Sequence, residues 1–175
     1  MPRTLGNTIA DSLELGLGYA ERLLQGVEAT HFARRAAPGG HLVASNHGAF
    51  LYGHLALYGP RIVGELGGDA ASIACPEPFA RLFSKDAVCQ DDPAGTLYPP
   101  MERIVDCFFR GYRTAVDTLR GAEDRLLDQA NPRGGPMAER FPTLGSMHAF
   151  YAGGHLMLHM GQMSAWRRMW DLPAA

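Results

Sequence analysis

The chain has 175 residues, of which 46% are hydrophobic and 19% are charged. This length and composition predict one globular domain, residues 1–175, with a sizeable apolar core. The formal net charge is −2, so no basic surplus favours nucleic acid or an anionic membrane surface as a partner.

Targeting and redox signals both indicate a cytoplasmic protein. The first residues, MPRTLGNTIADS, lack the apolar core of a secretory signal, and no apolar run reaches the roughly 18 residues of a membrane span. Cys75, Cys89 and Cys107 are odd in number and match no zinc-finger or disulfide spacing. We therefore expect three reduced cysteines that act as small apolar residues.

The first predicted helix covers about residues 7–35, and the APGG stretch at 37–40 would end it. Apolar residues recur along it at steps of three and four, which is typical of an amphipathic helix. This stripe consists of Ile9, Leu13, Leu17, Ala20, Leu24 and Val27.

The second predicted helix begins near Ser45 or Asn46, either of which can cap it, and stops by residues 67–68. Pro60 falls inside the pattern and predicts a kink, because proline has no backbone N–H and crowds the preceding turn. The inner face of this helix is expected to carry His47, Leu51, His54, Tyr58 and Ile62.

The third and fourth predicted helices follow proline signals. The third begins at YPPMERI, residues 98–104, and continues to NPRGGP at 131–136; its stripe is Met101, Ile104, Phe108, Tyr112, Ala115, Leu119, Ala122 and Leu126. The fourth begins after Pro142 with Thr143 as its cap, and its inner face is Leu144, His148, Tyr151, His155, Leu158, Gln162 and Trp166.

The lengths of the connections predict the topology. Modest loops join the first helix to the second and the third to the fourth, which favours antiparallel pairs. The long 67–99 segment, with a short helical piece around PEPFARLF, separates the second helix from the third. A segment of this length can cross the whole bundle. We therefore predict an all-α four-helix bundle, ordered up-down-down-up, with a long crossover between helices two and three.

The strongest functional signal is a pair of histidines one helical turn apart, His155 and His159. Side chains at this spacing can converge on one ion. The HExxH zinc motif uses the same spacing, but no glutamate follows His155, which excludes that motif. Two packed or solvated histidines remain the alternative at this point.

A third metal ligand would have to come from another helix, and His54 on the apolar face of the second helix is the best candidate. His47 and His148 each lie seven residues from His54 or His155, or roughly 10 Å along a helix, so they cannot easily share the site. Three neutral imidazoles leave positions open for water, and they suit zinc, nickel, iron or cobalt.

Gln162 lies one turn beyond His159 on the same face. It could fix a histidine ring or bind a metal water, or it could simply bond to backbone. Gly153 and Gly154 each cost a helix about 1 kcal/mol relative to alanine, which the close approach of a neighbouring helix or room for a ligand would justify.

Two stretches together resemble the DinB/YfiT-like superfamily of metalloenzymes. Its helix-two motif is similar to NHGAFLYGHLALY at 46–58, and its helix-four motif is similar to HLMLHMGQMSAWRR at 155–168. LF at 82–83 and YPP at 98–100 resemble landmarks of its crossover segment, so the resemblance covers nearly the whole chain. The chain departs from the pattern at Leu51 or Tyr52, where many relatives carry tryptophan or another aromatic residue, so the wall of the pocket beside the metal is expected to differ.

The resemblance implies an up-down-down-up bundle, a homodimer, and one divalent ion held by His54, His155 and His159. Zinc and nickel are the favoured ions, and iron and cobalt are also compatible. Trp166, Met169 and Trp170 would supply apolar surface for the dimer, or they would cover the base of the monomer's own core.

Relatives in this superfamily include enzymes that use low-molecular-weight thiols, such as mycothiol or bacillithiol. The resemblance thus implies a metal-dependent thiol S-transferase or hydrolase that acts on a small-molecule substrate. No Asp or Glu lies close to the histidines on the inner faces, since Glu65 is eleven residues from His54, which favours the transferase. A non-catalytic metal-binding or stress-response protein that retains the three-histidine site is the alternative.

Overall fold

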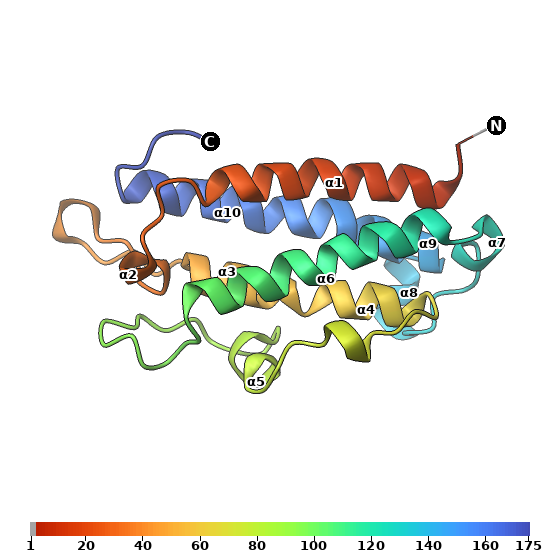
Figure 1. Cartoon of the computed structure of the whole chain (residues 1–175), viewed down its shortest axis with the longest axis horizontal. Coiled ribbons are helices and arrows are strands. Elements are labelled where there is room, and N and C mark those ends of the chain that lie inside the picture. Colours follow the sequence, from red (N-terminus) through yellow and green to blue (C-terminus); the bar gives the residue numbers. More distant parts are fainter. Residues whose placement is uncertain (1–2) are drawn as a thin grey trace.

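A computed structural model describes residues 3–175 of the chain (Figure 1). Within that range every named element is helical, and the only β pairing is an isolated bridge between Ala130 and Thr143. The predicted all-α class is therefore confirmed. The long elements are α1 (Leu5–Leu23), α3 (Gly48–Ala56), α4 (Tyr58–Glu65), α6 (Met101–Gly121), α9 (Leu144–Ala149), the π-helix η3 (Phe150–His155) and α10 (Leu156–Met169). The short ones are α2 (Ala29–Phe32), η1 (Pro38–Gly40), η2 (Ala71–Ile73), α5 (Phe79–Phe83), α7 (Asp124–Leu127) and α8 (Gly135–Arg140).

The long helices lie lengthwise beside one another, with α1 and α10 along one side and α3, α4 and α6 along the other (Figure 1). Helix α1 packs against α6 and α10, while α3 and α4 pack against α6 and α3 also contacts α10. The apolar stripes of these helices face inward and form one hydrophobic core, whose removal from water is the main force holding the fold together. Its fully buried side chains include Leu13, Leu51, Phe108, Tyr112 and Met160.

The first helix is shorter than predicted, because α1 ends at Leu23. Gly26 then has a φ of +74°, a conformation that glycine adopts without steric cost and that commonly follows a helix end. Val27 still packs against the core although it lies in the turn, and the chain resumes as α2 with Phe32 buried. Apolar residues therefore continue to pack against the core beyond the end of the helix. The prediction that the first helix extends to residue 35 is wrong.

The second helix begins at Gly48, and its cap is His47 rather than Ser45 or Asn46. The His47 Nδ1 atom accepts the Phe50 N–H at 3.2 Å. The predicted kink at Pro60 is confirmed, because the helix is interrupted at Leu57 between α3 and α4.

Proline's missing N–H leaves the carbonyl four residues earlier without its helical donor. That carbonyl belongs to Ala56, and the Cys75 thiol, from the connection between α4 and α6, donates to it with a sulfur–oxygen distance of 3.3 Å. The connection thus supplies the donor that the kinked helix lacks.

The third helix begins at Met101, as predicted, but it ends at Gly121, and Leu126 lies in the separate α7. The predicted helical piece in the preceding segment is α5, Phe79–Phe83. The connection that carries α5 lies along the outside of α3 and α4 (Figure 1).

Thr143 caps the fourth helix as predicted, in a capping box with Ser146. The helix then contains the π-helical turn η3, which the sequence pattern did not reveal. A π-turn bonds i to i+5 and so takes one more residue per turn than an α-helix. The apolar stripe shifts accordingly: Leu158 is 59% exposed and Gln162 is exposed, whereas Leu156, Met160 and Met163 are buried. The predicted inward placement of Leu158 and Gln162 is wrong.

The end of α10 covers the protein's own core. Trp166 is fully buried, and its indole N–H donates to the Arg34 carbonyl at 2.9 Å, while the Trp170 ring stacks on His31 with 4.2 Å between centroids. The expectation that Trp166 supplies surface for a dimer is therefore wrong.

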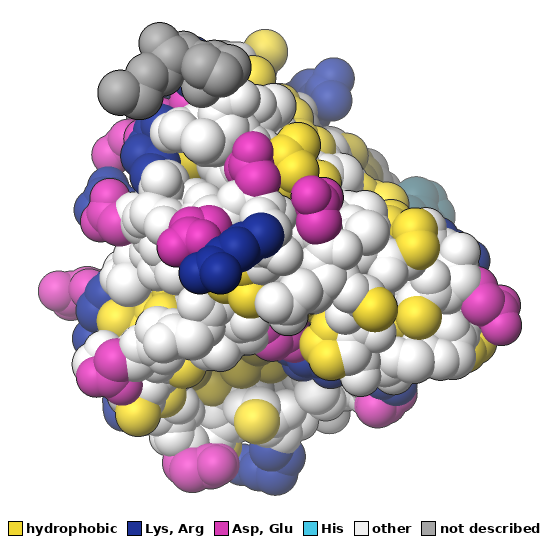
Figure 2. Space-filling view, turned by 90° about the vertical axis from the view of Figure 1, so that its right-hand side faces the viewer, with side chains coloured by type: hydrophobic (Ala, Val, Ile, Leu, Met, Phe, Trp, Pro, Cys, Tyr) yellow, Lys and Arg dark blue, Asp and Glu magenta, His cyan; other side chains and the backbone are white. Residues whose placement is uncertain are grey.

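Acidic and basic side chains are interspersed at the end of the molecule where α1 begins (Figure 2). This view shows no single-sign patch that would attract a polyanion or a polycation. Across residues 3–175, no helix combines the length and the apolar character that crossing a membrane requires.

Candidate metal centre

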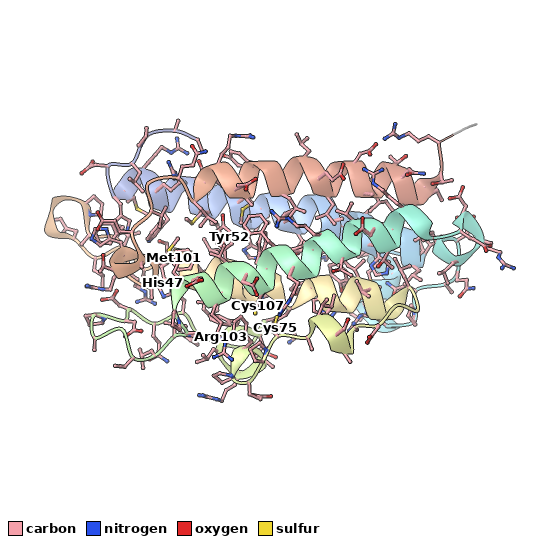
Figure 3. The ribbon with its side chains drawn as sticks, in the orientation of Figure 1. His47, Tyr52, Cys75, Met101, Arg103 and Cys107 are labelled. Atoms are coloured by element: carbon pink, nitrogen blue, oxygen red, sulfur yellow. The ribbon has the colours of Figure 1, made fainter. Side chains whose placement is uncertain are left out.

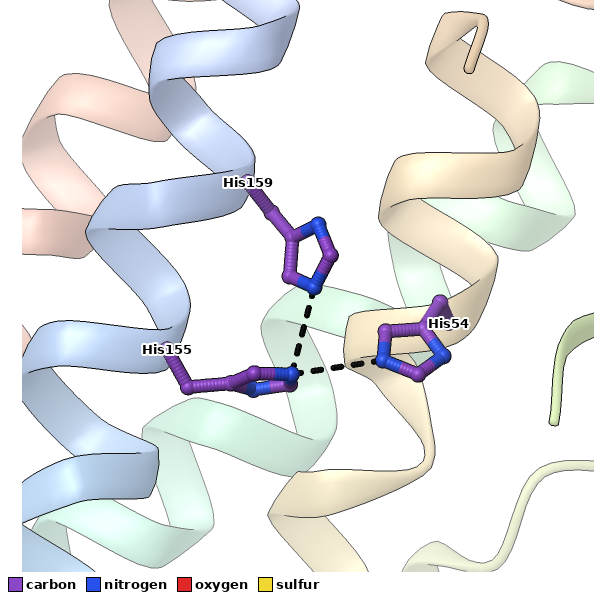
Figure 4. Close-up of side chains that lie close together, drawn as sticks. All are labelled: His54, His155 and His159. Atoms are coloured by element: carbon purple, nitrogen blue, oxygen red, sulfur yellow. Dashed lines mark hydrogen bonds between the residues drawn. The ribbon is translucent and has the colours of Figure 1, made fainter. Parts of the chain in front are cut away.

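The structure brings the three predicted histidines together between α3 and the fourth helix (Figure 4). His54 comes from α3, His155 is the last residue of η3, and His159 lies one turn into α10. The His155 Nε2 atom is 3.3 Å from Nε2 of His54 and 3.2 Å from Nε2 of His159. One candidate ligand atom from each ring lies within 4.8 Å of the other two. The predicted convergence of the rings is confirmed.

The opposite ring nitrogens of two of the histidines identify their tautomers. The His54 Nδ1 atom lies 2.8 Å from the Phe83 carbonyl oxygen, which can only accept a hydrogen bond. The His159 Nδ1 atom lies 3.0 Å from the Gln162 side-chain oxygen. Both Nδ1 atoms therefore donate, and in neutral rings the Nε2 atoms of His54 and His159 carry lone pairs.

His155 faces both of these lone pairs with the single nitrogen Nε2. Its Nδ1 atom is buried and has no hydrogen-bond partner among the described residues. If Nε2 carries a proton, it can donate fully to only one neighbour and leaves the other lone pair unsatisfied. A cation among the three Nε2 atoms would satisfy all of them, so these residues fit a divalent metal ion.

Burial favours the neutral, ligand-competent form of each ring. It lowers the pKa of His54 and of His159 below the ordinary value, and it lowers the pKa of His155 to about 3, with the neighbouring histidines adding to the effect. Rings that stay neutral near neutral pH have lone pairs free for coordination.

Aromatic side chains wall the three-histidine group on the side of α4 and η3. The Tyr58 ring lies 4.4 Å from the His155 ring and 5.2 Å from the His54 ring, measured between centroids. Phe150 and Tyr151 of η3 lie beside His155. The sequence placed Tyr58 on the inner face, four residues after His54, but it gave no sign that this ring lies against the histidines.

The two positions at which the pocket wall was expected to differ lie in the core. Leu51 and Tyr52 are fully buried, and the Tyr52 hydroxyl donates to the Ala20 carbonyl at 2.6 Å. Tyr52 thus bonds across the core to α1, and the Tyr58 ring lies beside His54 and His155.

The glycine pair before His155 lies in the π-turn. A Cβ atom on Gly153 would come within 3.1 Å of the Ser12 hydroxyl on α1, and one on Gly154 would lie 3.4 Å from the Phe150 ring. The expected close approach of a neighbouring helix is therefore confirmed for Gly153. π-Turns frequently occur at functional sites, and this one immediately precedes the two histidines of the fourth helix.

The histidines excluded by spacing lie elsewhere. His47 caps α3, and its Nε2 atom is 2.8 Å from the Gln90 carbonyl. His148 is buried near Glu65, with 3.7 Å between Nε2 and Oε2, and Glu65 also pairs with Arg133. Within the described residues, the metal-capable cluster contains no carboxylate, in agreement with the sequence.

No cysteine belongs to the three-histidine group among the described residues. Cys75 and Cys107 contact each other between the connection and α6 (Figure 3), and Cys89 is buried. Burial raises the pKa of all three thiols, that of Cys75 to about 12, so the reactive thiolate form is disfavoured. All three cysteines are free, as predicted.

Comparison of the chain with known protein families, with curated proteins and with solved structures finds no match. The chemistry of the three-histidine group therefore has to be inferred from its own residues. Those residues form a group that could hold a metal ion.

Proposed function

We propose that the protein binds one divalent metal ion through His54, His155 and His159. The observation that carries this proposal is the convergence of three Nε2 atoms, two of which belong to rings whose Nδ1 atoms donate elsewhere. Partners of this kind, here the Phe83 carbonyl and Gln162, orient metal-binding histidines and fix their tautomers. Imidazole ligands do not discriminate strongly among zinc, nickel, iron and cobalt; the resemblance favours zinc and nickel, with iron and cobalt as alternatives.

We further propose that the chain is a DinB/YfiT-like four-helix bundle with up-down-down-up order. The motif pair at 46–58 and 155–168 supports this, since its histidines are the ones that meet. The ribbon also supports it, because α3, α4 and α6 advance in one direction along the long axis while α1 and α10 advance in the other (Figure 1). A cytoplasmic homodimer belongs to the same proposal and rests on the resemblance.

The activity we propose is that of a metal-dependent thiol S-transferase. A divalent ion on three imidazoles supplies positive charge that lowers the pKa of a thiol or water beside it. The chain's own cysteines are half-buried or buried and have raised pKa values, so a thiol reactant would come from a small molecule. A hydrolase would need a general base, but no carboxylate belongs to the cluster, and Glu65 is already paired with Arg133.

Metal content tests the proposed site. Protein incubated with zinc or nickel and then desalted should retain about one ion per chain, as measured by mass spectrometry of the metal. His155→Ala should lose the ion, while His41→Ala, in an exposed loop, should keep it. Gln162→Leu should bind the ion about 10- to 100-fold more weakly, because the His159 ring loses its orienting partner. Equal metal content in His155→Ala and the wild type would refute the site.

Activity distinguishes the enzyme from the non-catalytic alternative. Glutathione, mycothiol and bacillithiol would each be incubated with monobromobimane and metal-loaded protein, with and without a chelator. The proposal expects conjugation above the uncatalysed rate with one of these thiols, and its loss with the chelator or in His155→Ala. Stoichiometric metal binding without conjugation by any of the thiols would favour a metal-binding or stress-response protein.

A further inference from the structure

A pocket opens beside the three-histidine group, with a volume of about 420 Å³. Its lining comes from α3, α4, the segment after α5, α8 and the π-turn. Of the three histidines, His54 lines it directly. The aromatic rings of Tyr58, Phe150 and Tyr151 form part of its wall, so the pocket combines flat apolar surface with the edge of the candidate metal centre.

Three cationic side chains line this pocket, and two of them are neutralised by carboxylates. Lys85 pairs with Asp86 at 2.7 Å, and both side chains are 78% exposed. Arg133 pairs with Glu65. Arg61 differs, because none of the ion pairs among residues 3–175 includes it.

Aromatic rings hold the Arg61 guanidinium at the pocket. Its central carbon lies 4.8 Å from the centroid of the Tyr58 ring and 5.9 Å from that of the Tyr151 ring. Such cation–π contacts position a guanidinium without neutralising its charge. One of its N–H groups also reaches the Tyr58 hydroxyl, and the remaining N–H donors are available to a ligand with matching acceptors.

The same aromatic wall connects Arg61 to the histidines. Tyr58 contacts Arg61 on one side and the His155 ring, 4.4 Å away, on the other. Arg61 also follows His54 by seven residues, or roughly 10 Å along the helix direction at 1.5 Å per residue. A small molecule can thus reach from the histidine group to the guanidinium along one face.

We propose that this pocket binds a small organic anion whose carboxylate or phosphate group is held by Arg61. Arginine suits both groups because its planar fork donates two parallel hydrogen bonds to paired oxygens. The unsaturated or apolar part of the molecule lies against Tyr58 and Tyr151, and its other end reaches His54. The further claim that this anion is the substrate of the metal centre rests on the proposed function. The claim that Arg61 binds the anion is independent of it.

Calorimetric titration of metal-free protein at low ionic strength tests the proposal. The probes are sodium succinate, sodium phosphate and the neutral analogue succinamide. Succinate or phosphate should bind at millimolar concentration and succinamide should not, and the better of the two anions identifies the carboxylate or the phosphate as the preferred group. Failure of both anions to bind, or equal binding of succinamide, would overturn the proposal.

Matched arginine variants locate the binding. Arg61→Gln should weaken anion binding at least about tenfold, because it removes a charge-assisted pair of hydrogen bonds, while Arg61→Lys should retain part of the affinity through its charge. Arg113→Gln is the control, since Arg113 also lies over a ring, 5.0 Å from the Phe109 centroid, but lines a different pocket. Wild-type affinity in Arg61→Gln, or an equal loss in Arg113→Gln, would place the anion elsewhere; circular dichroism confirms that each variant is folded.

Repeating the titration with metal-loaded protein separates this inference from the proposed function. Anion binding that depends on Arg61 in a protein without metal affinity would support the pocket and refute the metal centre. One bound metal ion per chain without anion binding would support the metal centre and refute the pocket.

Discussion

His148 is fully buried in α9, and neither of its ring nitrogens has a hydrogen-bond partner in the described part of the chain. The Glu65 carboxylate lies 3.7 Å from Nε2, but it is paired with Arg133, whose positive charge opposes protonation of the ring. Burial, followed by the charge of Arg133, lowers the pKa of His148 to about 4. The fold therefore holds this histidine neutral.

This lowered pKa predicts how stability depends on pH. The unfolded chain, with a histidine pKa of about 6.5, binds the proton more readily than the fold does, so stability falls as the pH drops from about 6.5 to about 4. The full contribution of His148 is about 3 kcal/mol, of which about 2 kcal/mol is lost by about pH 5. Urea unfolding of metal-free protein at about pH 7.5 and at about pH 5 measures this effect. Between these pH values, the free energy of unfolding of His148→Met should fall by about 2 kcal/mol less than that of the wild type.

His41→Met is the control for that measurement, because His41 is exposed in a loop. It should show the pH dependence of the wild type. If His148→Met does so as well, then His148 is not held neutral by the fold.

At the residue scale the sequence predicted which three histidines come together. His155 and His159 are one turn apart, and His54 lies on an apolar helical face, so helical geometry alone brought three of seven histidines into consideration. Arg61 was not found, because an arginine at the end of an apolar stripe looks like an ordinary surface residue. Its position depends on the rings of Tyr58 and Tyr151, and one of these comes from a distant part of the chain.

Helices α4 and α6 cross at a pair of glycines. A Cβ atom on Gly59 would lie 2.4 Å from the carbonyl carbon of Gly111 and 2.7 Å from its oxygen. These are backbone atoms, so a side chain at Gly59 cannot be accommodated by a rotamer change. The crossing holds α4, and with it Tyr58 and Arg61, close to α6.

Gly59→Ala should therefore destabilise the fold by about 1–3 kcal/mol through overpacking, despite the better helix propensity of alanine. Gly18→Ala, inside α1, is the matched substitution, because its Cβ would have only one neighbour, the Arg22 guanidinium at 3.9 Å. It should be neutral or stabilising by up to about 1 kcal/mol. The urea midpoint measures both, and an unchanged midpoint in Gly59→Ala would mean that the helices can separate at no cost.

At the element scale, local signals were reliable where the chain itself determines the structure. Thr143 with Ser146 forms the cap that the sequence indicated, and Pro60 interrupts its helix. The π-turn at 150–155, which packs against α1, was missed because a run of helical residues can bond to i+4 or to i+5 and the apolar pattern does not distinguish the two. The glycine pair at 153–154 was the only local sign of this π-turn. The extra residue in the turn shifts the apolar face of α10 relative to the predicted one.

At the scale of the whole molecule, the apolar stripes sufficed to predict a helical fold, but they did not show which apolar residues at its ends are buried. Trp166 looked like material for a dimer interface, yet it is fully buried against the monomer's own α2 region. The burial of Trp166 depends on how closely the end of α10 approaches the segment after α1. A sequence pattern does not show how far apart two distant segments lie.

Arg167 connects three distant parts of the chain at this same end of the molecule. The side chain is only 2% exposed. Its Nη1 atom donates to the carbonyls of Leu23 and Gln25 at 2.6 Å each, and Nη2 donates to Pro173 at 2.9 Å. One buried guanidinium thus joins the end of α1, helix α10 and the C-terminal segment. Its charge also lies at the negative end of the α1 dipole, where a cation is favoured.

Replacing this guanidinium should weaken the whole fold rather than one helix. Arg167→Met would leave the buried carbonyl of Leu23 and the partly buried carbonyl of Gln25 without this donor, at an expected cost of about 2–4 kcal/mol in the free energy of unfolding. Arg168→Met removes an exposed arginine that bonds only within its own helix, to Ser164, and should change stability by less than about 0.5 kcal/mol. Urea unfolding followed separately by tryptophan fluorescence and by circular dichroism should give one coincident, lowered midpoint for Arg167→Met. Similar midpoints for the two variants would show that α1, α10 and the C-terminal segment hold together without this contact.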